Sequence, residues 1–297
     1  MRDFTVSAYC SLLNALKSHS SAFCGFEDAV TGEQEAFIIL RHDVDRKPGY
    51  ALILAHAEAD SGIKGSYHFR LPGSRLQENV IREIAGLGHE IAYHYEDLSA
   101  LCRRLFHARH RVDEETARQA YDRFRENLCY LRKLAGVNVI SMHGSPLSTV
   151  DNRLLWKYYD YRESGIVCEP YFDIDVSDVL YLTDTGRRWD AERSNIRDRG
   201  YAHASETGTG ESAGWKTRPL SGSLMSMTPE GIAFRSRFRV HSTADLVRLA
   251  ENGMLPPKVI INTHPQRWTD KPLPWINELV NQSIKNQLKK LIASSKF

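Results

Sequence analysis

The sequence predicts an α/β protein in which helices cover one parallel sheet that is either open or closed into a barrel. Short apolar runs alternate with longer segments of helical periodicity along the 297 residues, which is the pattern of βα units. The run FIIL at 37–40 is apolar without alternation, as in a strand buried on both faces. Polar residues follow several runs directly, where parallel α/β folds place their sites.

Each predicted strand is a short apolar run that ends at polar or turn residues, and each predicted helix has apolar residues at spacings of three and four. The expected strands are 36–40, 65–69, 90–93, 137–142, 178–183 and 258–263. The expected helices are 4–18, 48–60, 77–86, 113–135 and one from about 275 onward. Pro48 opens the second helix, and glycines follow the ends of the second, third and fourth.

The length suits one α/β domain, and 42% hydrophobic with 26% charged residues is ordinary globular composition. We expect 1–35 to form a helical extension packed on the barrel domain, 36–297. Within that domain, 191–230 is rich in Gly, Ser, Thr and Arg and predicts a flexible insertion, with a lid as the alternative. The basic, amphipathic end IKNQLKKLIASSKF predicts a solvated last helix, with a membrane-surface role as the alternative.

Bulk properties exclude several classes of protein. A net charge of +2 carries no nucleic-acid signature. Five cysteines without C-x-x-C spacing indicate reduced thiols. The first residues show no secretory signal, and no run approaches the ~18 apolar residues of a membrane span. We therefore expect a cytoplasmic protein without a transmembrane segment; its oligomeric state stays open.

The stretch FIILRHDVD, 37–45, organises the rest of the chain. Four apolar residues run directly into charge, and Asp43 and Asp45 are two positions apart, so both point the same way if strand geometry persists. Two carboxylates at the end of a buried strand suit catalysis or metal binding. The alternative is that one of them caps the helix that Pro48 opens.

Other strands also end in residues that can bind metals or transfer protons. These residues are His94 followed by Glu96 and Asp97, His143, Asp184 followed by Arg187 and Trp189, and His264. Parallel strands would bring all of them to one rim. Histidine and carboxylate ligands with an open position suit Zn²⁺, and also Fe²⁺ or Co²⁺. A single histidine at a strand end more often has a structural role. We also assign a structural role to His42, His68 and His89, because they lie inside or just before the expected strands.

Four motifs resemble the polysaccharide deacetylases of the NodB-homology type, carbohydrate esterase family 4. RHDVD is similar to that family's first motif, GHEIAYH (88–94) to its second and INTHP (261–265) to its last, while SMHGSP takes the place of the third. The resemblance implies a deformed (β/α) barrel of seven or eight strands. It also implies hydrolysis of an N- or O-acetyl group from a sugar, with a divalent ion, commonly zinc, held by one Asp and two His.

The resemblance assigns roles position by position. Asp43 would be the catalytic base, Asp45 and His94 metal ligands, and His264 the general acid that protonates the leaving amine. The family's second motif carries another His four residues after the first, but this chain has Leu98 there. We expect His143 to supply the third ligand, with Glu96 and Asp97 as the other candidates.

The expected function is a metal-dependent hydrolase that deacetylates a sugar, a cytoplasmic precursor of a cell-surface polysaccharide linked to a nucleotide or lipid. The expected substrate-binding residues combine aromatic side chains for stacking, arginines for a diphosphate and two rim carboxylates. They are Tyr95, Trp189, Trp268, Arg70, Arg187, Glu96 and Asp184. One alternative is another C–N hydrolase acting on a cyclic amide or ureide. The other is a non-catalytic carbohydrate-binding protein that has lost the metal.

Overall fold

The structure is a computed structural model that describes residues 2–19, 21–32, 34–71, 77–104, 112–144, 150–175, 177–189, 237–238 and 240–294. The insertion expected over 191–230 lies outside the described residues.

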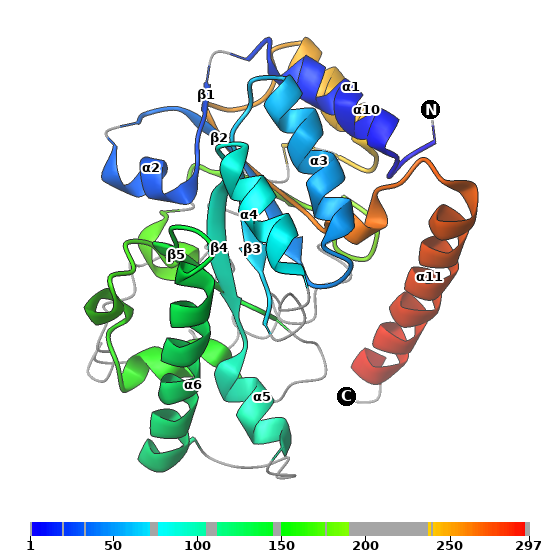
Figure 1. The fold of residues 1–297 in the computed structure, drawn as a ribbon. Coiled ribbons are helices and arrows are strands. Elements are labelled where there is room, and N and C mark those ends of the chain that lie inside the picture. The colour runs from blue at the N-terminus through cyan, green and yellow to red at the C-terminus, as the bar shows by residue number, and fades with distance from the viewer. Residues whose placement is uncertain are drawn as a thin grey trace.

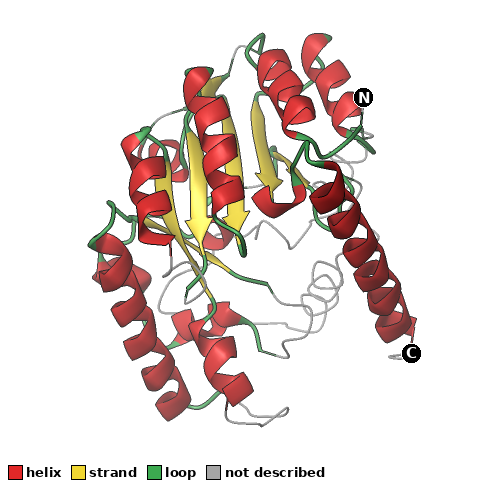
Figure 2. Cartoon of the chain, turned by 45° about the vertical axis from the view of Figure 1, so that its right-hand side comes forward, coloured by secondary structure: helices red, strands yellow, loops and turns green. Residues whose placement is uncertain are grey.

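Seven parallel strands form one sheet, in the order β5-β4-β3-β2-β7-β6, with β1 also paired to β2. Their bounds are β1 Ala22–Phe23, β2 Phe37–Val44, β3 Gly65–Phe69, β4 Glu90–Tyr95, β5 Val139–Met142, β6 Leu180–Thr183 and β7 Lys258–Thr263. In the part of the chain that the structure describes, β5 and β6 end the path, so the sheet is an incomplete barrel (Figure 2). The predicted parallel α/β fold of the deformed-barrel type is confirmed.

Helices surround the sheet and follow the strands in sequence, as the predicted βα pattern requires (Figure 1). They are α1 Val6–Leu16, α2 Phe26–Thr31, α3 Gly49–Asp60, α4 Glu78–Gly86, α5 Asp97–Arg104, α6 Glu114–Arg132, α7 Pro170–Asp173, α10 Thr243–Glu251 and α11 Pro272–Ser294. Short 3₁₀ turns lie at Asn152–Lys157, Tyr161–Ser164 and Pro265–Arg267. No described helix has the length and apolar character to cross a bilayer.

β2 is the central strand and is buried along its whole length. Ile39 belongs to a core cluster shared with β3, β4, β5 and α6, whereas Ile38 and Leu40 belong to a second cluster shared with α1, α10 and β7. Alternate side chains of one strand therefore join the two halves of the core. This central place fixes the position of the charged residues at the carboxyl end of β2.

β2 is longer than expected, since it continues through the charged residues to Val44. Those residues keep the strand conformation because each has a buried partner: Arg41 pairs with Asp43, and His42 with Glu58 of α3. The region before residue 36 also supplies β1, so it contributes a strand as well as helices. α3 has Pro48 at its N-cap and no side-chain cap hydrogen bond, so the capping alternative for Asp43 and Asp45 is wrong.

Candidate metal and catalytic site

The site lies where neighbouring parallel strands end. Asp45 follows β2, His94 lies in β4, His143 follows β5 and His264 follows β7. The register places His94 opposite Ser141 of β5 and His42 opposite Thr263 of β7, and all four strands run in the same direction, so their carboxyl ends lie along one edge of the sheet. Residues 219 positions apart thus meet, as Asn262 and Asp43 do through a hydrogen bond of 2.9 Å.

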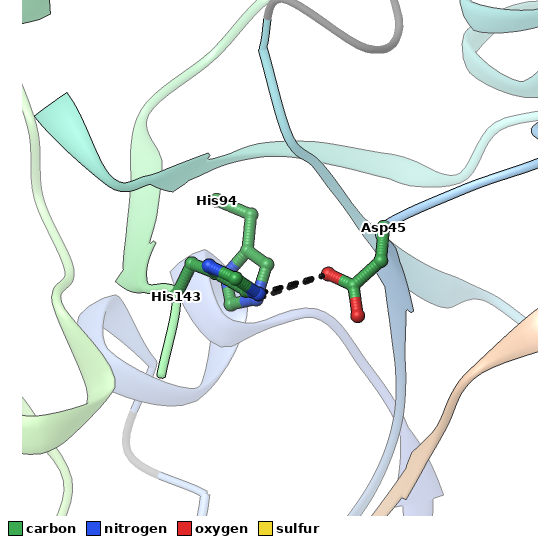
Figure 3. Close-up of side chains that lie close together, drawn as sticks. All are labelled: Asp45, His94 and His143. Atoms are coloured by element: carbon green, nitrogen blue, oxygen red, sulfur yellow. Dashed lines mark ion pairs between the residues drawn. The ribbon is translucent and has the colours of Figure 1, made fainter. Parts of the chain in front are cut away.

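Asp45, His94 and His143 converge on one point, and their ligand atoms all lie within 4.8 Å of one another (Figure 3). Nε2 of His143 is 3.6 Å from Oδ1 of Asp45, and Nε2 of His94 is 3.8 Å from the same oxygen. That oxygen is buried and accepts no hydrogen bond from any described residue. Two imidazoles and an unsatisfied carboxylate oxygen fit a divalent ion with open coordination positions.

Both histidines are held by their other ring nitrogen. Nδ1 of His94 lies 3.1 Å from the carbonyl oxygen and 3.0 Å from the hydroxyl of Ser141, and Nδ1 of His143 lies 3.1 Å from Oε2 of Glu96. Such partners set the tautomer and orientation of metal-binding imidazoles. Burial lowers the pKa of His94 to about 4, so its ring is neutral near pH 7, as a ligand must be.

Glu96 forms the outer support of this site. It accepts hydrogen bonds from Arg70 at 2.7 Å and Arg103 at 3.1 Å as well as facing His143. Burial opposes its ionisation, but His143 and Arg70 together lower its pKa to about 2. Glu96 is therefore an ionised carboxylate that positions His143, rather than a ligand or a substrate-binding group as expected from the sequence.

Asp43 lies beside the three convergent residues and is fully tied into hydrogen bonds. It accepts from Arg41 at 2.8 Å and from Asn262 at 2.9 Å, and its Oδ2 is 3.9 Å from Nε2 of His94. Burial opposes ionisation, yet Arg41, His94 and His264 hold the pKa of Asp43 well below its usual range. Asp43 is thus ionised near pH 7.

His264 also lies next to Asp45. Its Nε2 is 3.9 Å from Oδ2 of Asp45, while its Nδ1 is 2.6 Å from Oδ1 of Asp184. Asp184 is completely buried and also accepts from Arg267 and from the indole of Trp268. Although burial opposes it, Arg267 and His264 lower the pKa of Asp184. Asp184 therefore orients His264 and is not a substrate contact.

The aromatic residues expected to stack on sugar rings are buried, and that expectation is wrong for the conformation described. Tyr95 has an exposed fraction of 0%, Trp189 of 3% and Trp268 of 1%. Tyr95 hydrogen-bonds Glu169 and Trp156, while the two tryptophans pack against Phe4 and each other. Their faces are occupied by protein side chains, so none is open to a ligand.

Two charged residues of the predicted rim also point elsewhere. Arg187 is 7% exposed, donates to the carbonyl oxygen of Trp275 and lies over that indole ring. Asp97, a candidate third ligand, accepts from Tyr93 at 2.6 Å and Asn127 at 2.7 Å, away from Asp45. Arg70, with its side chain 31% exposed, is the predicted substrate-binding residue that keeps substantial access to solvent.

Leu98, which stands where the family has a histidine, is completely buried in the larger core cluster. It lies in the first turn of α5 and belongs to the core cluster that also contains apolar residues of α6. His143 on the neighbouring strand end occupies the third position of the convergent group. His143 therefore offers the third ligand nitrogen that Leu98 cannot provide.

Sequence reasoning missed three polar residues that organise the rim: Arg41, Ser141 and Asn262. Ser141 contacts His94, His68 and Arg41, and Asn262 contacts Asp43. Each lies two positions before a predicted site residue, Asp43, His143 or His264. The alternation of side chains along a strand was the signal that could have identified them. His42, His68 and His89 are hydrogen-bonded in the interior, as their structural assignment expects.

No family model matches the chain, and no curated protein matches it significantly. Similar solved structures include Bacillus subtilis PdaA, a family 4 carbohydrate esterase, with 11% identity and a TM-score of 0.39 over 92% of this chain and 82% of that one. They also include the Bc1960 peptidoglycan N-acetylglucosamine deacetylase, with 15% identity and a TM-score of 0.36 over 93% and 90%. The peptidoglycan deacetylase PdaC from Bacillus subtilis has 12% identity and a TM-score of 0.32 over 87% of this chain and 96% of that one.

These proteins are of the class that the four motifs resemble. At such identities and TM-scores the likeness carries no argument of its own, so the functional conclusion rests on the site.

Proposed function

We propose that this chain is a metal-dependent hydrolase that removes an acetyl group from an N-acetylated or O-acetylated sugar. The observation that carries the proposal is the convergence of Asp45, His94 and His143, with a buried carboxylate oxygen that accepts no hydrogen bond from described residues. Asp43 lies 3.9 Å from His94, and His264 lies 3.9 Å from Asp45. A metal-binding face between a base and an acid suits hydrolysis of an amide or ester.

The proposed roles follow from the protonation states and the hydrogen bonds. Asp45, His94 and His143 would hold the ion, which when bound would supply Lewis acidity toward the acetyl carbonyl and the attacking water. Asp43, ionised beside Arg41, accepts the proton of the water. Asp184 holds Nδ1 of His264, which leaves Nε2 to donate a proton to the departing sugar nitrogen or oxygen.

The substrate that we propose is a nucleotide-linked or lipid-linked sugar, a precursor of a cell-surface polysaccharide. Arg70 supports this choice, because its guanidinium lies next to Glu96 at the edge of the site and its side chain is partly exposed. A guanidinium suits a diphosphate better than an ammonium does, since its fork matches the phosphate oxygens. The buried tryptophans contribute no stacking to this recognition.

The first test is the metal content of untagged protein, measured by elemental analysis after incubation with Zn²⁺, Co²⁺ or Fe²⁺. We expect about one divalent ion per chain, lost in the separate variants Asp45→Ala and His94→Ala. Asp178→Ala is the matched control, because Asp178 is an exposed carboxylate paired with Lys258 away from the rim. An ion retained in both rim variants, or no ion under any condition, would contradict the proposal.

A substrate panel separates the deacetylase from its alternatives. Release of acetate from a nucleotide-linked acetylated sugar, weaker with the free sugar and reduced in Arg70→Gln, is the expected result. Turnover of a cyclic amide instead would indicate another C–N hydrolase. Sugar binding without turnover in the metal-loaded protein would indicate a binding protein.

A further inference from the structure

A chain of hydrogen bonds runs along one face of the sheet, from the amino end of β4 to His94. Glu90 opens β4 and accepts a hydrogen bond from the hydroxyl of Ser66 on β3. The same hydroxyl lies 2.9 Å from Nε2 of His68, and Nδ1 of His68 lies 2.7 Å from the hydroxyl of Ser141 on β5. That hydroxyl is 3.0 Å from Nδ1 of His94. Residues four apart in a strand share a face, so Glu90 and His94 lie on the same side of the sheet.

The links of this chain are shut off from water. Ser66, His68 and Ser141 are each 0% exposed, and His94 is 3% exposed. Burial, together with the guanidinium of Arg41, lowers the pKa of His68 well below its usual range, so this ring is neutral near pH 7. A neutral imidazole donates from one nitrogen and accepts at the other. The hydrogen bonds on the two sides of His68 therefore run in one common direction.

Glu90 sets that direction at the amino end of β4. A carboxylate only accepts hydrogen bonds, and this one also accepts from the backbone N–H groups of Phe26 at 3.0 Å and Glu27 at 2.9 Å. Burial raises the pKa of Glu90, but these two donors and Ser66 favour its ionised form. Ser66 therefore donates to Glu90 and accepts from the Nε2–H of His68, which leaves Nδ1 of His68 as an acceptor.

Arg41 sets the same direction at the other end. A guanidinium only donates, and Nη2 of Arg41 lies 3.1 Å from the hydroxyl oxygen of Ser141. Ser141 gives its single hydrogen to Nδ1 of His68, so its two lone pairs accept from Arg41 and from the Nδ1–H of His94. A neutral His94 protonated at Nδ1 carries its lone pair on Nε2, which lies 3.8 Å from Oδ1 of Asp45 (Figure 3).

We propose that this chain, from Glu90 through His68, fixes the tautomer of His94 and keeps Nε2 free for a divalent ion. Glu90, Ser66 and His68 are thus positioning residues, and the inference rests on the proposed function only for the use made of Nε2. Without Ser66, His68 can adopt its other tautomer and donate to Ser141, whose hydrogen then turns to Nδ1 of His94. The carbonyl oxygen of Ser141, 3.1 Å from that Nδ1, favours the original tautomer, so a broken chain should give a mixture of tautomers.

Long-range proton–nitrogen NMR of the histidine side chains in the metal-free full chain tests the proposal at neutral pH. We expect His94, assigned by comparison with His94→Ala, to be protonated at Nδ1 in wild type. Ser66→Ala and His68→Phe should each add a population protonated at Nε2. His68→Asn should not, because its side-chain oxygen can accept from Ser141 in place of Nδ1. Ser21→Ala is the matched control, since Ser21 is a buried serine whose hydroxyl donates to a backbone carbonyl.

Affinity for Zn²⁺, measured by competition with a chelator on variants that circular dichroism shows to be folded, is the second readout. It should fall about tenfold in Ser66→Ala and in His68→Phe, and change less than about threefold in His68→Asn and Ser21→Ala. Wild-type His94 protonated at Nε2, or a tautomer unchanged in both Ser66→Ala and His68→Phe, would overturn the proposal. A wild-type chain that binds no Zn²⁺ while the tautomer responds as expected would contradict the proposed metal site and support the positioning role.

Discussion

Asp184→Asn probes the carboxylate that organises His264. Asp184 is completely buried, and its two oxygens accept hydrogen bonds from the backbone N–H and Nδ1 of His264, from Arg267 and from the indole of Trp268. Asparagine has the same shape but replaces one oxygen by an NH₂ group. Each oxygen of Asp184 accepts two of these hydrogen bonds. In either orientation of the asparagine amide, two buried N–H groups would therefore face its NH₂ group, which is itself a hydrogen-bond donor.

The expected cost follows from those contacts. Two unsatisfied buried donors cost about 1–3 kcal/mol each, and Arg267 loses its buried counter-charge, so the free energy of unfolding should fall by roughly 3–5 kcal/mol. The folded-state pKa of Asp184 lies below its ordinary 3.8. Its stabilising contribution is therefore present above the unfolded value and lost as pH falls through the lower folded value. The difference between wild type and variant should be full at pH 7 and shrink below about pH 4.

Urea denaturation across this pH range is the assay. Asp178→Asn is the matched control, because its carboxylate is 57% exposed and forms a surface pair with Lys258 at 2.8 Å. The control should cost less than about 1 kcal/mol. A similarly small loss in Asp184→Asn, or a difference that does not depend on pH, would refute the reasoning. In the folded variant, deacetylation should fall about 10²- to 10⁴-fold, since His264 loses the partner that sets its tautomer.

Three further predictions concern the β4 end of the site. Leu98→His should not strengthen the metal site, because it places an imidazole in the apolar core at a cost of about 1–3 kcal/mol in unfolding free energy. Glu96→Gln should weaken metal binding about 10- to 100-fold, measured by competition with a chelator, because His143 loses its orienting carboxylate. The free energy of unfolding of the Asp97→Asn variant, relative to that of wild type, should increase as pH rises from 4 to 7. Burial raises the pKa of Asp97 to about 6 despite hydrogen bonds from Tyr93 and Asn127, so its ionisation above that pH costs the folded state on the order of 1–3 kcal/mol.

Each of these three has a contradicting result, and the first two also have a control variant. Leu98→Met keeps the apolar volume and should leave metal content and stability nearly unchanged; tighter metal binding in Leu98→His would place that residue in the site after all. Glu115→Gln removes an exposed carboxylate and should not alter metal affinity; an unaltered affinity in Glu96→Gln would show that His143 needs no support. For Asp97→Asn, a constant difference from wild type between pH 4 and 7 would show that the carboxyl titrates normally.

Local sequence patterns determined the strands and the residues at their ends. Each predicted strand is a short segment rich in apolar residues that ends near a charged, imidazole or turn residue, so both features can be read within about ten residues. Because βα units make the strands parallel, the sequence alone was enough to assign Asp45, His94, His143 and His264 to one rim. The parallel pairing of β2, β3, β4, β5 and β7 places the carboxyl ends of these strands along one edge of the sheet.

Tertiary structure alone decided what each polar or aromatic side chain contacts. The faces of Trp189 and Trp268 are covered by Phe4 from the other end of the chain, and Glu96 meets His143 from 47 positions away. α11 is amphipathic in sequence, but only its contacts at Glu278 and Asn286 show that its apolar side faces outward. The physical reason is that apolar periodicity depends on neighbours along the chain, whereas the burial and pKa of a side chain depend on groups that folding brings to it from elsewhere.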